Sequence, residues 1–546
     1  MTTPDLLRAG RESFRRREWA ESYDALSAVD KNQTLEIDDL ERLATASYLI
    51  GRDEESARLW SRAHQQALRH DKVERAARCA FWLAFGLLNR GEQARGSGWI
   101  ARARRLLDAE TNDCVEQGYL LLPEAYRHLV EGEIEEGYAA FCRAAEIGEQ
   151  FGDPDLIVLA LHSRGRVLIR MGKVDEGVQL LDEAMAAVEA DEVSPVVAGD
   201  VYCSVIEGCH EIFDIRRAQE WTAALDQWCA SQPEMILYSG QCLVRRAEIM
   251  QLHGAWSDAI EATERACERL LHGSGQPAAG AAFYRQAELF RLRGEFDKAE
   301  EAYREASRWG RKPHPGLALL RLAQHRLADA SSAIRRALDE ARGRSDRANL
   351  LSGCVEIMIA EGDVAEARKA ADELARLAVA LGSPLLYAMA ARADGEVRLA
   401  EGDARAALEP LRTAWAKWNE LDVPFEAACV RVAMGRACRA LADHDTADIE
   451  FEAARGAFER LGAAPHVAHI DELFLRDSPR EAHGLSTREM EVLRHLASGE
   501  TNKEIGARLF ISERTVERHV SNLLNKLGVS SRAGATAAAY KHGLLE

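Results

Sequence analysis

The segment from residue 511 to residue 532 reads ISERTVERHVSNLLNKLGVSSR and carries side chains that can hydrogen-bond to nucleic acid. Arg514, Arg518, Asn522 and Asn525 follow one another at intervals of three or four residues, so they share one side of a helix. Guanidinium and amide groups can each make two hydrogen bonds to one base edge. A helix about 10–12 Å wide suits a major groove about 12 Å wide. The segment therefore predicts contact with double-stranded DNA.

The other side of this helix is apolar. Val516, Val520, Leu523, Leu524 and Leu527 recur at helical spacing, which predicts that they face a core. The side chains left facing outward are all charged or polar: Glu513, Arg514, Glu517, Arg518, Ser521, Asn522 and Asn525.

Start and stop signals divide the last residues of the chain into four short helices. The predicted signals are a capping box at Ser486 and Glu489 with an end at Gly499, a second box at Thr501 and Glu504, an N-cap at Ser512 with an end at Gly528, and a start at Ser531 with an end at Gly543. The short link LFIS between the second and third helices is typical of a helix-turn-helix.

These motifs resemble the LuxR-type helix-turn-helix domain. The matching segment is GLSTREMEVLRHLASGETNKEIGARLFISERTVERHVSNLLNKLGVSSRAGATAAA, and it spans Gly484 to about Tyr540. The resemblance implies that the helix after the turn enters the major groove and that the last helix pairs two subunits on a palindromic site. The candidates for phosphate contacts are Lys503, Arg514, Thr515 and Lys526. The candidates for base contacts are Glu517, Arg518, Ser521 and Asn522.

The chain departs from the family pattern at two positions of this helix. Many members have Lys where this chain has Glu517, and a basic residue is also frequent at the position of Ser521. Glu517 could accept a hydrogen bond from cytosine N4, or it could orient Arg514 or Arg518, and we favour the second interpretation. His519 is expected to be packed and half-buried.

Charge is distributed unevenly along the chain. The whole chain carries a formal charge of −19, but the segment from Arg480 to the end holds ten Lys and Arg against eight Asp and Glu, which gives +2. One copy of so weakly basic a domain should bind DNA weakly and in a salt-dependent way. Pairing of two copies would strengthen binding by raising the effective concentration of the second domain.

A short sequence phrase recurs at intervals of about forty residues through the long acidic part. GEFDKAEEAYREA, GAWSDAIEATERA and GKVDEGVQLLDEA share a turn residue followed by small residues five and twelve positions later. The predicted turn positions are Arg17, Gly51, Gly91, Gly132, Gly172, Phe213, Gly254, Gly294, His325, Gly362, Gly402 and Ala442. Each predicts a helical hairpin that must stack on its neighbours to bury its apolar face.

The phrase resembles the tetratricopeptide repeat in a longer variant, over about Leu6 to Pro465. We therefore predict an all-α chain: a superhelical solenoid of about twelve helical hairpins, then a small four-helix helix-turn-helix domain. The expected boundaries are a repeat domain over 1–466, a closing helix and linker over 467–483, and the DNA-binding domain over 484–546. The resemblance also implies a concave face lined by the first helix of each hairpin.

Glutamates form a ladder six residues before the turn in five hairpins. This glutamate ladder consists of Glu207, Glu248, Glu288, Glu356 and Glu396. The favoured interpretation is that it is neutralised by arginines on adjacent turns, with Arg245, Arg246, Arg285 and Arg291 as the partners. The alternative is a groove for a cationic peptide, a basic protein surface or a polar small molecule.

Several functional classes are not indicated by the sequence. There is no apolar run long enough for a signal or a membrane span, the eleven cysteines lack the spacing of a zinc site, and no GxxxxGK(S/T) phosphate-binding loop occurs. We expect a cytoplasmic protein, associated with the nucleoid when bound to DNA, that is no enzyme and takes no cofactor or metal.

Two functions from different classes remain. The favoured one is a sequence-specific transcription regulator, by family resemblance an activator, whose DNA-binding tail is controlled by an effector bound to the solenoid. The effector could be a small molecule, a peptide or a protein; the other expected partners are double-stranded DNA, a second copy of the chain and RNA polymerase. The alternative is an interaction scaffold whose tail serves dimerisation or docking.

Overall fold

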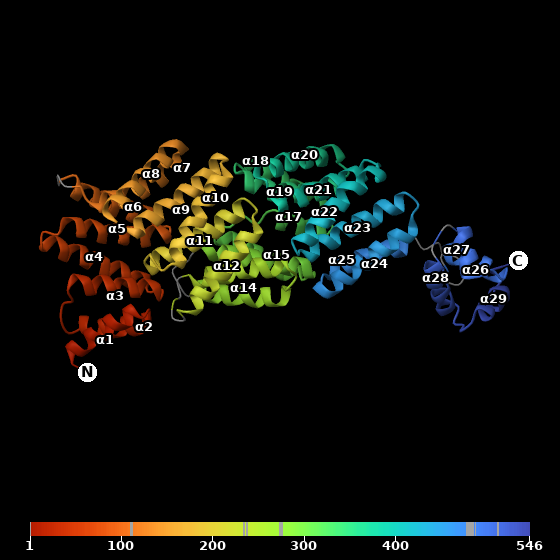
Figure 1. The fold of residues 1–546 in the computed structure, drawn as a ribbon, viewed down its shortest axis with the longest axis horizontal. Helices are drawn as coiled ribbons and strands as arrows, with labels where there is room; N and C mark the ends of the chain where they lie inside the picture. Colours follow the sequence, from red (N-terminus) through yellow and green to blue (C-terminus); the bar gives the residue numbers. More distant parts are fainter. Residues whose placement is uncertain are drawn as a thin grey trace. The chain divides into compact units, whose positions relative to one another are not determined.

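The computed structural model describes residues 2–109, 113–232, 235, 238–271, 277–476, 485, 487–509, 511 and 513–545. Within these ranges the chain forms 29 helices and no strand, which confirms the all-α prediction. The chain divides into two compact units, Met1–Pro465 and His466–Glu546 (Figure 1). Among the helices described, none is both long enough and apolar enough to cross a bilayer.

The first unit consists of twelve helical hairpins, as the repeats predict (Figure 1). The first helices are α1 Thr3–Arg15, α3 Ile37–Leu49, α5 Val73–Asn89, α7 Val115–Glu131, α9 Pro154–Met171, α11 Pro195–Glu211, α13 Ser239–Leu252, α15 Pro277–Arg293, α17 Gly316–Ala323, α19 Arg344–Glu361, α21 Pro384–Ala400 and α23 Pro424–Ala440. The second helices are α2 Trp19–Asp30, α4 Asp53–Arg69, α6 Gln93–Leu107, α8 Ile134–Phe151, α10 Val174–Glu189, α12 Ile215–Ala230, α14 Trp256–Leu271, α16 Phe296–Arg308, α18 Leu327–Glu340, α20 Val364–Leu381, α22 Ala404–Glu420 and α24 His444–Leu461.

All twelve predicted turn residues have a positive φ. The eight glycines lie between 77° and 89°, a region that glycine enters without steric cost. The four other residues, Arg17, Phe213, His325 and Ala442, take the same left-handed conformation at 58° to 64°. A side chain there costs about 1 kcal/mol, so the packing of the two helices determines the turn even where glycine is absent.

The residue five positions after each turn lets the two helices of a hairpin approach closely. It is small and buried in every hairpin: Ser22, Ser56, Gly96, Gly137, Gly177, Ala218, Ala259, Ala299, Ala330, Ala367, Ala407 and Ala447. The crossing of α9 and α10 is tight, since a Cβ on Gly177 would lie 2.6 Å from the backbone oxygen of Gly165. A larger side chain has no space at that crossing.

The solenoid winds back on itself, so that hairpins far apart in sequence touch. The contacts are an ion pair of Arg17 with Asp191, a hydrogen bond from Ser383 Oγ to the backbone oxygen of Phe213 at 2.8 Å, and a contact of His253 Nδ1 with the backbone oxygen of Asp422 at 2.8 Å. Each contact joins the turn of one hairpin to the start of the hairpin five further along. One superhelical turn therefore takes about five hairpins.

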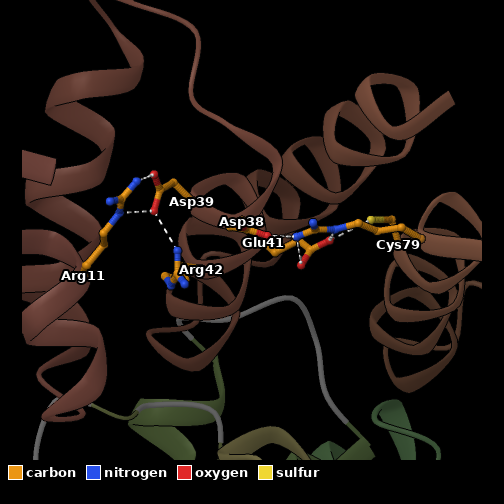
Figure 2. A network of polar contacts seen from close by, with 7 residues as sticks. Arg11, Asp38, Asp39, Glu41, Arg42 and Cys79 are labelled. Atoms are coloured by element: carbon orange, nitrogen blue, oxygen red, sulfur yellow. Dashed lines mark hydrogen bonds and ion pairs between the residues drawn. The ribbon is translucent and has the colours of Figure 1, made fainter. Parts of the chain in front are cut away.

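Ion pairs also connect the first helices of neighbouring hairpins (Figure 2). Asp39 on α3 is buried and accepts hydrogen bonds from Arg11 on α1, at 2.6 and 2.8 Å, and from Arg42 at 2.8 Å. Arg75 on α5 donates to Glu41 on α3 at 2.8 and 2.9 Å. Burial alone would raise the pKa of Asp39, but the two arginines outweigh it and hold that pKa below its ordinary value.

Replacing Asp39 by Asn should lower the free energy of unfolding of the first hairpins by about 1–2 kcal/mol. This is less than for a fully buried pair, because Arg11 and Arg42 can regain water. A depressed carboxyl pKa stabilises the fold above the ordinary value of 3.8, and the stabilisation is lost as the pH falls through the lower folded value. The difference between the wild type and the variant in denaturant melts should therefore be constant near neutral pH and vanish in acid. Asp258→Asn, on the exposed side of α14, is the control; equal effects of both changes at pH 7 would contradict the prediction.

The C-terminal residues form five further helices. They are α25 Ala464–Arg476, α26 Thr487–Ala497, α27 Asn502–Leu509, α28 Glu513–Lys526 and α29 Arg532–Lys541. α25 lies in the stretch expected to close the repeats. The predicted caps Ser486 and Ser512, and the linker residues 477–483, lie outside the described residues.

Candidate nucleic-acid interface

The remaining start and stop signals of the four short helices are confirmed. The backbone N–H of Thr501 donates to Glu504 at 2.7 Å, and the backbone N–H of Glu504 donates to Thr501 Oγ1 at 3.3 Å. The Thr501 backbone N–H and the Thr501 hydroxyl both donate to the Glu504 carboxylate, and these two hydrogen bonds lower the pKa of Glu504. Ser531 accepts from the backbone of Gly534 at 3.1 Å at the start of α29. Gly499, Gly528 and Gly543 have a positive φ where helices end.

The apolar side of α28 anchors this helix in the domain. Val516, Val520 and Leu523 are buried, and Leu524 and Leu527 pack against the same clusters. Val516 and Val520 lie with apolar residues of α26 and α27, whereas Leu523 lies with residues of α26 and α29. Because α28 contacts all three neighbours, its orientation within the domain is fixed.

The outward side of α28 is polar, as predicted. The exposed residues are Glu513, Arg514, Glu517, Arg518, Ser521, Asn522 and Asn525. Thr515 and His519 are half-buried at the edge of this side. The four residues expected to contact bases therefore lie on one continuous surface, with Arg514 beside them.

Two residues expected to contact phosphate differ in their surroundings. Lys503 is exposed on α27. Lys526, at the end of α28, donates to Glu489 on α26 at 2.7 Å, and Glu489 is buried. The Lys526 ammonium thus has a structural ion pair that the sequence did not indicate, since its partner lies 37 positions earlier.

Two arginines that sequence reasoning missed hold the helix-turn-helix together. Arg488 on α26 donates to the backbone oxygen of Leu509 at 2.6 Å, at the end of α27. Arg532 at the start of α29 donates to the backbone oxygen of Glu500 at 2.7 Å and also to Asn502. Both arginines lie in the quoted motifs, in STRE and VSSR, but a motif does not reveal that their partners are main-chain oxygens at helix ends.

Most of the glutamate ladder is ion-paired. Glu248 is paired with Arg285, with Arg245 at 3.3 Å and with His210 at 3.5 Å. Burial would raise the pKa of Glu248, but Arg285 and its neighbours hold it far below the ordinary value. The other pairs are Glu207 with Arg166 at 3.4 Å, Glu288 with Arg291 at 2.8 Å, and Glu396 with Arg392 at 2.8 Å.

Two details of the ladder differ from the rest. Arg246, expected to pair with the ladder, pairs instead with Asp226 on α12 at 3.3 Å, because it lies on the side of α13 that faces the second helix of the preceding hairpin. At Glu356, surrounding protein atoms raise the carboxyl pKa; Arg392 opposes this rise and Glu396 adds to it. Glu356 is thus the ladder member with the least stable negative charge.

Comparison with known proteins places the similarity in the C-terminal helices. The profile of the bacterial regulatory proteins of the luxR family matches residues 483–539. Three similar proteins come from Bacillus subtilis (strain 168): the uncharacterized transcriptional regulatory protein YhcZ, 55% identical over 60 residues; the transcriptional regulatory protein LiaR, 48% identical over 61; and the spore germination protein GerE, 47% identical over 62. Each match covers 11% of this chain, and they cover 28%, 29% and 84% of the relatives. The chain thus spans less than a third of the first two and most of GerE.

Two solved structures that align with most of the chain have low TM-scores. They are the Cut9–Hcn1 hetero-tetramer of the APC/C, with a TM-score of 0.36, 13% identity and coverage of 86% of this chain and 96% of that one, and a Rap protein complexed with competence and sporulation factor, with a TM-score of 0.33, 9% identity and coverage of 84% and 98%. Because these TM-scores are low, the architecture of the solenoid is established from the helices of this chain and not from the two structures.

Proposed function

This chain belongs to the luxR family of bacterial regulatory proteins, and we propose that it is a sequence-specific regulator of transcription in which α28 reads the major groove of DNA. The observation that supports this most is the uninterrupted polar side of α28, held outward by buried Val516, Val520 and Leu523. In this proposal Arg518, Ser521 and Asn522 contact base edges, with Glu517 beside them. Lys503, Arg514 and Thr515 position the helix on phosphates, and Lys526 adds to them at the edge.

We propose that two copies bind one palindromic site. A single domain carries little net positive charge, so its phosphate contacts alone would be weak. On α29, Ala533, Ala537 and Tyr540 are exposed and line one shallow hollow, with Thr536 between them. Small residues around one aromatic ring allow two such helices to approach closely. α29 is therefore the proposed pairing surface.

The solenoid is proposed to control the tail, with activation as the expected outcome. Effector binding would change the winding or the self-association of the solenoid and so free or pair the DNA-binding domains. RNA polymerase is the further partner that activation requires. The glutamate ladder remains a candidate partner surface at Glu207 and Glu356, its more exposed members.

The test is selection of binding sites from a genomic DNA library at two salt concentrations, with the full-length chain and with the fragment 466–546. Recovery of one palindromic sequence by either protein supports the proposal. A weaker signal from the full-length chain than from the fragment would show that the solenoid restrains the tail. If neither protein selects a sequence, the regulator proposal fails and the interaction scaffold replaces it.

Lys503 gives a prediction that separates phosphate contacts from base contacts. Lys503→Ala should weaken binding to specific and random DNA about equally, and should reduce the slope of log K against log salt by about 0.9, the value for one phosphate contact. Fluorescence anisotropy at several salt concentrations measures both quantities. Arg494→Ala, which removes the same charge from an exposed position of α26, is the matched control. An unchanged slope for Lys503→Ala would remove Lys503 from the interface.

A further inference from the structure

A polar cavity of about 600 Å³ lies among the helices of the solenoid. Its walls come mainly from the first helices of five consecutive hairpins, α7, α9, α11, α13 and α15, and from residues 309–311 after α16. This volume is in the range of pockets that hold small-molecule ligands. We call this space the arginine-lined cavity, after Arg166, Arg170, Arg245, Arg285 and Arg311 in its walls.

The five arginines differ in how far their charge is already compensated. Arg166 donates to Glu211 at 2.6 Å and lies 3.4 Å from Glu207. Arg245 and Arg285 share Glu248. In the part of the chain that the structure describes, no ion pair is found for Arg170 or Arg311, and both are exposed to the cavity. The Arg311 guanidinium lies over the ring of Tyr284, 5.3 Å from its centroid, which limits its freedom.

A buried histidine on the wall has an unused ring nitrogen. His162 is 1% exposed, and its Nε2 has no hydrogen-bond partner among the residues that the structure describes. Its Nδ1 lies 3.1 Å from Ser204 Oγ, which itself accepts from Arg166 at 3.3 Å. The Ser204 hydroxyl proton is therefore available for Nδ1, which leaves Nε2 as an N–H donor beside the cavity.

A carboxylate lies close to this donor, but not close enough for a hydrogen bond. Asp200 Oδ2 lies 3.8 Å from His162 Nε2, beyond hydrogen-bond distance. Burial lowers the pKa of His162 to about 3 and raises the pKa of Asp200 to about 6, so at pH 7 the ring is neutral and the carboxyl group mostly ionised. A hydroxyl group placed against both could accept from His162 and donate to Asp200. A buried polar group without a partner is costly, so filling this position is favourable.

We propose that the arginine-lined cavity binds a hydroxylated organic anion, whose carboxylate or phosphate group is held by Arg170 and Arg311 and whose hydroxyl group bridges His162 and Asp200. Guanidinium groups match carboxylate and phosphate oxygens in geometry as well as charge. Asp200 and Glu207 also line the cavity and repel an anionic group beside them, so the charged end of the ligand is directed to the exposed guanidinium groups of Arg170 and Arg311.

The cavity defines the chemical class of the effector for the regulator proposed above, so its role in regulation rests on that proposal. Binding itself does not, because every residue of the site belongs to the solenoid. All ten tryptophans also lie in the solenoid, between Trp19 and Trp418, and Trp309 lines the cavity. Tryptophan fluorescence therefore reports on the solenoid without interference from the DNA-binding domain.

The test titrates the full-length chain, without DNA, with gluconate, glucose 6-phosphate and 6-phosphogluconate, and follows tryptophan fluorescence and the tryptophan-detected melting temperature. At least one probe should give a saturable change and raise the melting temperature above that in sodium chloride of equal ionic strength. Neutral glucose and inorganic phosphate should bind much more weakly than the best of the three probes, since glucose lacks the anionic group and phosphate lacks the organic hydroxyl group. Arg170→Gln and Arg311→Gln should each weaken binding roughly ten- to hundredfold, the equivalent of one charge-assisted hydrogen bond.

Arg105→Gln on α6 is the control, since Arg105 is exposed and does not line the cavity. It should bind the probe as the wild type does. No saturable response to any of the three probes, or an equal response in the Arg170 and Arg311 variants, would overturn the proposal. Because no DNA is present, that result would leave the DNA-binding proposal standing, and a failure of DNA selection would not affect this measurement.

Discussion

Replacing Arg518 and Asn522 together by alanine should weaken specific DNA binding by about 2–6 kcal/mol, since each lost base contact costs about 1–3 kcal/mol. Both side chains lie on the exposed side of α28 and neither belongs to its core. The variant should therefore keep the wild-type melting temperature. Binding to random DNA should fall less than binding to the selected site, because the phosphate contacts of Lys503 and Arg514 remain.

Electrophoretic mobility shifts on the selected and a scrambled site, at one fixed salt concentration, measure this loss of discrimination. Arg494→Ala provides a matched control: it removes the same charge from an exposed position of α26. The control should retain the preference for the selected site. If the double variant bound both sites as the wild type does, α28 would not be the helix that reads DNA.

Gly177→Val should lower the free energy of unfolding of the solenoid by about 3 kcal/mol, the upper part of the range for overpacking. A Cβ at this position would lie 2.6 Å from the backbone oxygen of Gly165 and 2.8 Å from Ile169 Cγ1. Main-chain atoms of a packed helix cannot move aside cheaply, so α9 and α10 must separate. Leaving glycine in a helix normally costs about 0.5–1 kcal/mol, and the steric conflict outweighs what its replacement would gain.

Denaturant unfolding followed by tryptophan fluorescence tests this prediction. Gly98→Ala on α6 is the matched control, since Gly98 is also helical but an added Cβ would have none of the described atoms within 4 Å. That change should stabilise the solenoid by about 0.5–1 kcal/mol. A stabilising effect of Gly177→Val would show that the two helices are not held at the distance described here.

The turn and cap positions could be predicted because the interactions that fix them are local. A left-handed turn followed five residues later by a small residue marks a hairpin, and the surrounding phrase identified Phe213 and His325 as turns without a glycine. The outward side of α28 followed from the spacing of Val516, Val520 and Leu523 alone.

Interactions between distant residues could not be predicted in the same way. Lys526 and Glu489, and equally His162 and Asp200, are 37 to 38 positions apart, and their approach depends on how helices pack. The ladder showed that glutamates recur at one position, but not that Arg246 would point to the opposite side of its helix. Sequence periodicity gives the side of a helix on which a residue lies; it does not give the residue that faces it.

The contacts between hairpins five apart change what is expected of this solenoid as it folds. An array in which each repeat touches only its neighbours can fold from any point and lose its end repeats one at a time. Here Phe213 with Ser383, and His253 with Asp422, close loops of about 170 residues, and such long-range closure slows folding. The hairpins in the middle of the chain cannot make all their contacts until the later hairpins have formed. The solenoid should therefore fold and unfold in large blocks. A truncation at either end should destabilise hairpins a whole superhelical turn away.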